Sequence, residues 1–246
     1  MSNRTDGHEK DREKSGHGRG HDGHHGKDHG KGHGADDDFE GLYVVSATGV
    51  AERGMFLGQD ISGEEFTLSY AINFNDPVVE TDGTSFTSYI DQEPRYNSVI
   101  ISAEVGGIRQ EDVIENTAGP QETDRTTLGI SDDRPDTGAD GLSAFLRGES
   151  GTFSFFHDSF LFLVNPDGDF TDSISLEQEL TYSVQDEDTA NVAYSLFDNI
   201  VSETTHFFTG RATEISLNAG DPLELFEREN LALLGFPVES GCSVGW

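Results

Sequence analysis

The chain has little of what usually crosslinks or anchors a protein of its size. Its 246 residues include one cysteine, Cys242, so no intramolecular disulfide can form. No run reaches the roughly 18 apolar residues of a membrane-spanning helix, and the N-terminus lacks the apolar stretch of a cleaved signal peptide. We therefore expect no membrane insertion. We expect a location outside the cell or at its surface, reached by a non-classical route, with a cytoplasmic location as the alternative.

Lysine is missing from the whole chain after Lys31. Eight arginines therefore oppose 38 acidic residues in residues 39–246, which carry a formal charge of −30. Such a surface repels nucleic acid and anionic membranes, so neither is expected as a partner. An acidic, lysine-poor composition resembles that of proteins from halophilic or marine microbes, or from calcium-rich extracellular fluids.

Aromatic residues are absent from residues 1–38, which are built mainly from Gly, His, Lys and Asp. We interpret this segment as a disordered tail and residues 39–246 as one acidic domain. Neutral imidazole is a common transition-metal ligand, so the tail is predicted to bind Zn, Ni or Cu. The alternative is a tail that only aids solubility. The candidate ligands are seven histidines: His8, His17, His21, His24, His25, His29 and His33.

Apolar and polar residues alternate in two stretches, 66–74 and 173–184, and Gln178 alone interrupts the apolar row of the second. This period of two is typical of a half-buried strand with a wet outer face. In the first stretch the apolar set is Phe66, Leu68, Tyr70, Ile72 and Phe74. In the second we expect a buried set of Ile174, Leu176, Leu180, Tyr182 and Val184. The set expected to be exposed there is Ser175, Glu177, Glu179 and Thr181.

Further short strands are predicted between turn signals, and residues 108–141 are predicted to be a surface loop apart from a strand at 126–131. Residues 142–147 fit either a helical turn or a strand. Residues 223–234 predict one short helix that buries Leu223, Phe226, Leu231 and Leu234. The fold class is therefore all-β, an antiparallel β-sandwich or jelly roll of about nine to ten strands, with a barrel as the alternative.

Two segments, ATGVAERGMFLGQDISGEEFTLSYAINF (47–74) and FDNIVSETTHFFTGRATEISL (197–217), resemble bacterial exported β-sandwich proteins of the PEP-CTERM exosortase-substrate type. The resemblance implies a sandwich fold and a surface or extracellular setting, and it implies no reaction. The chain departs from that family because it shows no Val-Pro-Glu-Pro sorting motif, terminal apolar helix or basic tail.

A turn at 165–172 carries carboxylates at Asp167, Asp169 and Asp172. Such oxygen ligands suit Ca²⁺, although the spacing departs from an EF-hand loop, so a polar hairpin turn is the alternative. The pairs and runs at 132–133 and 186–188 are interpreted as solvated turns.

His157 and His206 lie in phenylalanine-rich strands, and we interpret them as packed or rim residues because no catalytic motif accompanies them. We favour a non-enzymatic extracellular or surface-associated module, structural or ligand-binding, that requires no cofactor. Carbohydrate is one candidate ligand, and the partner is otherwise unknown. A metal-buffering protein that works through its tail, and a carbohydrate-active enzyme on a jelly-roll scaffold, are the alternatives.

Overall fold

A computed structural model describes residues 42–74, 78–81, 83, 85–91, 99–114, 125–134, 137–150, 154–201 and 203–237. The chain divides into two units, Met1–Asp38 and Phe39–Trp246, and every described residue belongs to the second. The predicted tail, with its seven histidines, and Cys242 lie outside the described residues. Among the described residues, no helix has the length and apolar character needed to cross a membrane.

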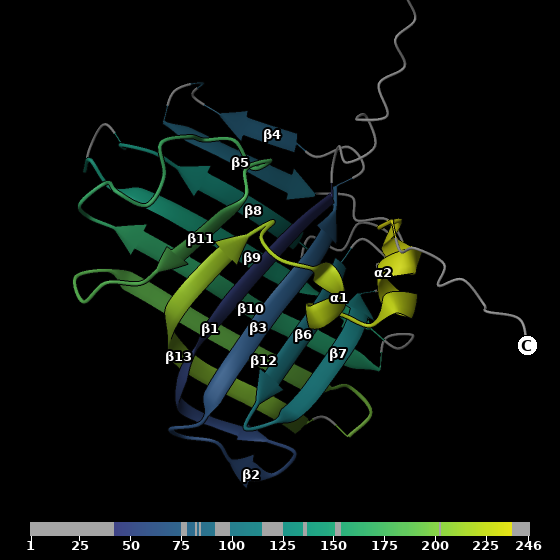
Figure 1. The fold of residues 1–246 in the computed structure, drawn as a ribbon. Coiled ribbons are helices and arrows are strands. Elements are labelled where there is room, and N and C mark those ends of the chain that lie inside the picture. Colours follow the sequence, from purple (N-terminus) through teal and green to yellow (C-terminus); the bar gives the residue numbers. More distant parts are fainter. Residues whose placement is uncertain are drawn as a thin grey trace, which may run out of the picture. The chain divides into compact units, whose positions relative to one another are not determined.

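Within the described residues, thirteen antiparallel strands form one sheet that folds over into two layers (Figure 1). One layer, which we call the helix-covered layer, contains β1 (Leu42–Phe56), β3 (Glu65–Asn73), β6 (Val99–Val105), β7 (Ile108–Ile114) and β13 (Glu203–Leu217). The other, the open layer, contains β4 (Val78–Thr81), β5 (Phe86–Asp91), β8 (Arg125–Ser131), β9 (Asp140–Ser150), β10 (Phe155–Asn165) and β12 (Thr189–Asp198). Two short strands pair at the margins: β2 (Gln59–Asp60) with β1, and β11 (Leu180–Ser183) with β13.

The all-β antiparallel sandwich is confirmed, with more strands in the described chain than the nine or ten expected. The added strands are short or polar, and β7 is the clearest case. The sequence predicted a loop there, yet Gly106 and Gly107 adopt positive φ values of 57° and 78° and turn the chain back so that β7 pairs with β6. Backbone pairing forms this strand although its side chains show little apolar alternation.

The alternation along β3 is confirmed on its inner side and wrong on its outer side. All five apolar residues from Phe66 to Phe74 are buried in the core between the layers. On the other side Ala71 is also buried, because α2 (Arg228–Leu234) contacts β3 and β6, and Ser69 is buried with its hydroxyl bonded to Ser46. Ala71 packs there with Ile100 and Leu231 in a second apolar cluster.

The C-terminal helical segment is broken in two, α1 (Pro222–Leu225) and α2. Phe226 is extended between them and buried, as are Leu231 and Leu234, whereas Leu223 is 38% exposed. The prediction of a single helix that buries Leu223 is therefore wrong. Asp221 caps α1 through its side chain, and the break at Phe226 turns that ring onto the sheet.

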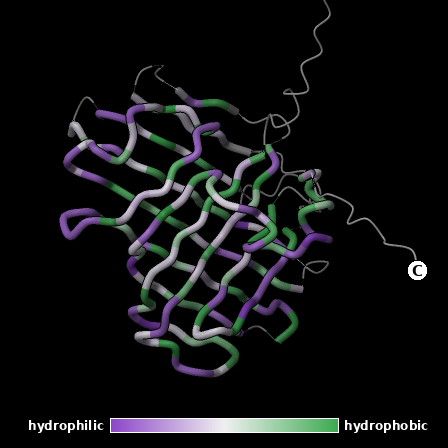
Figure 2. The backbone as a smooth tube through the Cα atoms, viewed as in Figure 1, coloured by the Kyte–Doolittle hydropathy of each residue, from purple (hydrophilic) through white to green (hydrophobic). Residues whose placement is uncertain are grey.

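The second alternating stretch forms a shorter strand than predicted, since only β11 is extended and paired. The four residues expected to be exposed are exposed, and Leu176 is buried. The other four apolar residues are half-buried and pack against the edge of the core. Gln178 binds the carbonyls of Ser173 and Ser175 and holds the preceding residues in a loop. Figure 2 shows the mixture of hydrophobic and hydrophilic residues along the strands.

Candidate functional site

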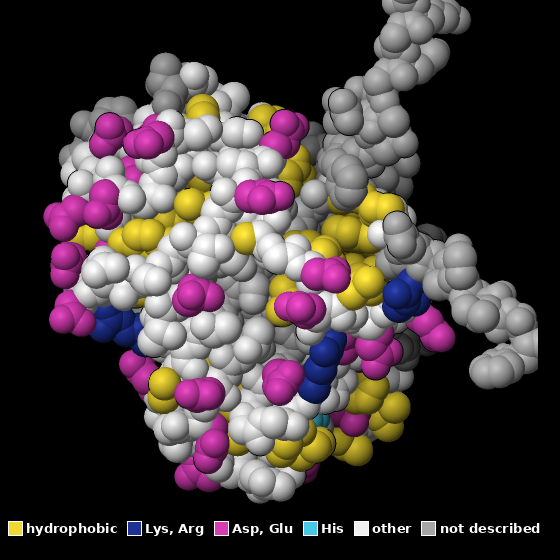
Figure 3. Space-filling view, viewed as in Figure 1, with side chains coloured by type: hydrophobic (Ala, Val, Ile, Leu, Met, Phe, Trp, Pro, Cys, Tyr) yellow, Lys and Arg dark blue, Asp and Glu magenta, His cyan; other side chains and the backbone are white. Residues whose placement is uncertain are grey.

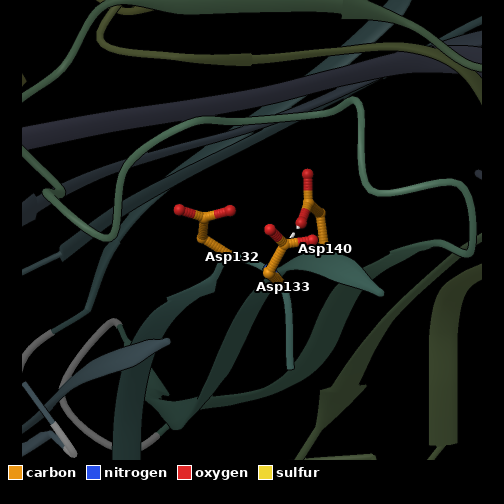
Figure 4. A group of neighbouring side chains, drawn as sticks. All are labelled: Asp132, Asp133 and Asp140. Atoms are coloured by element: carbon orange, nitrogen blue, oxygen red, sulfur yellow. Dashed lines mark hydrogen bonds between the residues drawn. The ribbon is translucent and has the colours of Figure 1, made fainter. Parts of the chain in front are cut away.

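Three aspartates gather where β8 ends and β9 begins (Figure 4). Asp132, Asp133 and Asp140 each offer a carboxylate oxygen, and these oxygens lie within 4.8 Å of one another. Strands β8 and β9 pair so that Ser131 faces Gly141, which brings the two ends of the connecting loop together. We call these three residues the aspartate triad.

Asp140 is the structural centre of the triad and is 1% exposed. Its Oδ1 accepts a hydrogen bond from the backbone N–H of Asp133 at 2.9 Å. Its Oδ2 accepts from the N–H groups of Phe170 and Thr171 at 3.0 and 2.9 Å. These bonds join the β8–β9 loop to the segment that follows β10 and satisfy amide groups that would otherwise be buried unpaired.

Asp132 is the residue most affected by its neighbours. Burial raises the pKa of its carboxyl, and the charges of Asp140, Asp133 and Asp172 raise it further. A cation would relieve this repulsion, and carboxylate oxygens are the ligands that Ca²⁺ prefers. Both oxygens of Asp140 already accept backbone N–H groups, so Asp132 and Asp133 have the freer oxygen atoms.

The predicted calcium residues lie beside the triad and do not form such a group among the described residues. Asp169 accepts from the side-chain amide of Asn165 at 2.9 Å, and that amide also donates to Asp188 at 3.0 Å. The turn itself abuts the triad: a Cβ on Gly168 would lie 3.1 Å from Asp133 Oδ1. The interpretation of 186–188 as a solvated turn is wrong for Asp188, which is 6% exposed.

A hollow of about 380 Å³ opens beside the triad on the outer side of the open layer. Asp140 and Arg134 line it, together with Gly129 and the ring of Phe162. The base of the hollow is lined by small residues, because β8 and β9 carry glycine and serine there. Ser143 lies opposite Gly129 across the two strands. The hollow has the size of a small-molecule site and mixes apolar walls with a few polar groups.

A set of phenylalanine rings continues from the hollow across β9, β10 and β12. Their inward neighbours along each strand are buried, so these rings point out from the open layer. Phe160 and Phe162 are 39% and 42% exposed. We call this set the aromatic face: Phe145, Phe156, Phe160, Phe162 and Phe197.

Uncharged and charged polar groups both lie among these rings, and Glu149 faces Phe156 in the strand register. In the strand register Phe162 lies between Ser143 and Asn191, and Ser195 lies beside Asp158. Asp158 faces Arg147, whose Nε is 4.0 Å from its Oδ2. The guanidinium of Arg147 also lies over the ring of Phe156, 5.3 Å from its centre, in a cation–π contact. The aromatic face therefore has little net charge within a strongly acidic domain.

Both histidines of the described chain lie inside the sandwich, His157 at 0% and His206 at 7% exposure. His157 Nε2 is 2.8 Å from Ser150 Oγ and 3.8 Å from Asp112 Oδ2, a carboxylate that reaches in from β7. Burial and the nearby His206 lower the pKa of His157 to about 3. Burial also lowers the pKa of His206, and Asp112 opposes that shift.

Asp112 is the residue of this cluster that the sequence analysis missed, because β7 was interpreted as loop. Burial raises its pKa, and a hydrogen bond from Gln110 partly opposes the rise. The spacing of Ile108, Gln110, Asp112 and Ile114 at every second position could have indicated a strand with polar residues on its inner side. The triad had a similar signal, since its members flank two segments that can pair as a hairpin.

Comparisons of this chain with protein-family models, curated proteins and solved structures find no match. The fold defines it as an all-β antiparallel sandwich.

Proposed function

We propose that the chain is a non-enzymatic, surface-associated module that binds carbohydrate on the aromatic face and in the adjoining hollow. The observation that carries the proposal is the exposure of Phe160 and Phe162 beside a hollow of about 380 Å³. Exposed apolar surface is costly in water, and a contiguous patch of it is typical of an interaction site.

Carbohydrate suits this surface for three reasons. A sugar ring has an apolar C–H face that stacks on aromatic rings, and its hydroxyls need uncharged hydrogen-bonding groups such as those of Ser143, Asn191 and Ser195. A sheet presents such groups at regular spacings of about 5 Å between strands and about 7 Å along them. A neutral glycan is also not repelled by the acidic charge of the domain, unlike nucleic acid.

A non-enzymatic role is supported by the position of the two histidines. Both described imidazoles, His157 and His206, lie between the layers, away from the aromatic face. Asp158, on the face, pairs with Arg147. The tail's proposed binding of Zn, Ni or Cu is a separate property, and the carbohydrate proposal does not depend on it.

The test is binding of the full chain to insoluble cellulose, chitin and xylan, with the double variant Phe160→Ala/Phe162→Ala beside the wild type. We expect the dissociation constant for at least one polysaccharide to rise about tenfold or more in the variant, a loss typical of removing central aromatic contacts. Leu233→Ala and Val50→Ala are matched controls, since these residues are 58% and 43% exposed on the helix-covered side. The controls should bind like the wild type.

Two results would contradict the proposal. One is equal binding by the wild type and the double variant, or no binding to any of the polysaccharides. The other is a wild type that sediments as a dimer and a double variant that sediments as a monomer. That second result would assign the aromatic face to contact between two copies of the chain.

A further inference from the structure

A group of polar side chains lies inside the sandwich, where a hydrophobic core would normally be. His157 comes from β10, His206 from β13 and Asp112 from β7, so the group joins both layers. In the strand register His157, Leu196 and His206 form one row across β10, β12 and β13. Their side chains therefore point into the same region between the layers.

Each imidazole has one ring nitrogen without a hydrogen-bond partner in the described part of the chain. These atoms are His157 Nδ1 and His206 Nε2, and both are buried. The other nitrogens contact hydroxyls: His157 Nε2 lies 2.8 Å from Ser150 Oγ and His206 Nδ1 lies 2.9 Å from Thr205 Oγ1. A buried polar atom left unpaired costs free energy, and a charge at the same place would cost more.

The surroundings offer little to stabilise an added positive charge. His206 packs edge-on against the ring of Phe56 with ring centres 4.6 Å apart. Within the described chain, the titratable groups near the two imidazoles are the carboxyl of Asp112 and the buried phenols of Tyr194 and Tyr70. Glu111 acts on the Asp112 carboxyl from the outer side of β7. Tyr70 donates to Ser159 across the layers at 2.9 Å and is not free to bind the imidazoles.

The position of Asp112 limits the expected effect of histidine protonation to the β7 edge of the sandwich. It lies on β7, at one end of the sheet order, and β7 contacts β9 across the gap between the layers. Asp112 is half-buried, 3.8 Å from His157, and is therefore the near partner for a protonated imidazole. Burial outweighs this attraction, because the pKa of each histidine is lowered, so a protonated imidazole gains hydration when this edge moves apart.

We propose that His157, His206 and Asp112 make the packing of the two layers at the β7 edge of the sandwich sensitive to acid. The layers stay packed at this edge while both imidazoles are neutral, and they separate there when the imidazoles take up protons. This regulatory device does not depend on what the aromatic face binds.

The direction in which stability changes with pH follows from proton linkage. The pKa of each histidine is lower in the folded chain than the value of about 6.5 in an unfolded one, so the unfolded state binds more protons as the pH falls below that value. Stability from these two groups is full above pH ~6.5 and is lost on acidification. Asp112 acts in the opposite sense, because its raised pKa lets the folded chain take up a proton first.

The test is urea unfolding of the full chain at fixed ionic strength from pH 7.5 to 5.0, with His157→Gln/His206→Gln beside the wild type. Between pH 6.5 and 5.0 we expect the wild-type unfolding constant to rise relative to that of the variant, by up to about tenfold per pH unit for each histidine. Ser159→Ala is the matched control, since Ser159 is buried in the same region and does not titrate. Its pH profile should run parallel to the wild type, and parallel profiles for the histidine variant would overturn the proposal.

Two measurements on the wild type keep the proposal testable if that variant does not fold. NMR titration of histidine ring signals should find two whose pKa is lower than that of the others. Hydrogen exchange, corrected for its intrinsic pH dependence, should rise at pH 5.0 in β7 more than in β1. Titration of all histidines near 6.5 in the folded chain, or an equal rise in both strands, would overturn it.

Discussion

The outer faces of the two layers of the sandwich differ in how their apolar residues are covered. On the helix-covered layer the outward apolar residues Val44, Ala71 and Ile100 are buried, because Leu231 and Leu234 of α2 pack over them. The rest of that face carries scattered acidic side chains (Figure 3), and Val50, Met55 and Phe207 are 43%, 43% and 37% exposed there. On the open layer the rings of Phe160 and Phe162 are 39% and 42% exposed, and no helix of the described chain packs over them.

The difference separates apolar residues that stabilise the fold from apolar residues that are available to a ligand. Burial of an outward apolar residue under α2 contributes to folding, whereas an exposed ring contributes little and exposes apolar surface to water. Outward alternation alone does not distinguish the two cases. What distinguishes them is whether another segment of the same chain covers the face.

The largest effect that can test this comparison comes from truncating a ring on each layer. Phe226→Ala removes a ring that is 2% exposed and should lower the free energy of unfolding by about 3–5 kcal/mol. Phe160→Ala, at 39% exposure, should lower it by about 1 kcal/mol or less. Urea unfolding of both variants measures the difference. Equal losses would mean that the two faces are not distinct in their contribution to stability.

Salt should have a smaller effect, on the order of 1 kcal/mol between dilute buffer and about 1 M NaCl. Eight arginines oppose a formal charge of −30 in residues 39–246, so self-repulsion is greatest where screening is weakest. We expect the melting temperature to rise with salt, and carbohydrate binding on the weakly charged aromatic face to change little. Melting temperatures that stay flat or fall across the salt series would contradict the first expectation.

The smallest expected effect is at the aspartate triad, which adjoins the hollow. Asp132→Asn removes a carboxylate whose pKa is raised by burial and by the neighbouring charges, so it should stabilise the protein by a few tenths of a kcal/mol at pH 7. The gain should vanish near pH 3, because the Asp132 carboxyl of the wild type is then protonated in both the folded and the unfolded state. Thermal melts of both proteins at the two pH values check this, and a loss of stability at pH 7 would contradict it.

The sequence predicted the fold where one strand carries its own signal. Phe66, Leu68 and Tyr70 alternate with smaller residues, and their burial follows from that spacing alone. The burial of Ala71 did not follow, because the segment that covers it, α2, lies more than 150 residues away in the chain. Strand register and the covering of a sheet face by another segment depend on tertiary structure, and they override the local sequence pattern.

The candidate site was less predictable for the same reason. Asp132 and Asp140 meet because β8 and β9 pair, and residues 142–147 had been left open between helix and strand. The aromatic face required knowing that β10 runs unbroken through His157 and Asp158. The inward-facing positions of β7 include the polar residues Gln110 and Asp112, so its sequence lacks the apolar alternation that predicts a strand.

The most direct test of the central claim, that the uncovered aromatic face is the binding surface, is an NMR titration of the full chain. The ligand is a soluble oligosaccharide from whichever polysaccharide the wild type retains. We predict that amide shifts change mainly in β9, β10 and β12 and in the loop at 131–140, while β3, β6 and α2 stay unchanged. Shift changes centred on the helix-covered layer, or none in β9, β10 and β12, would contradict the account.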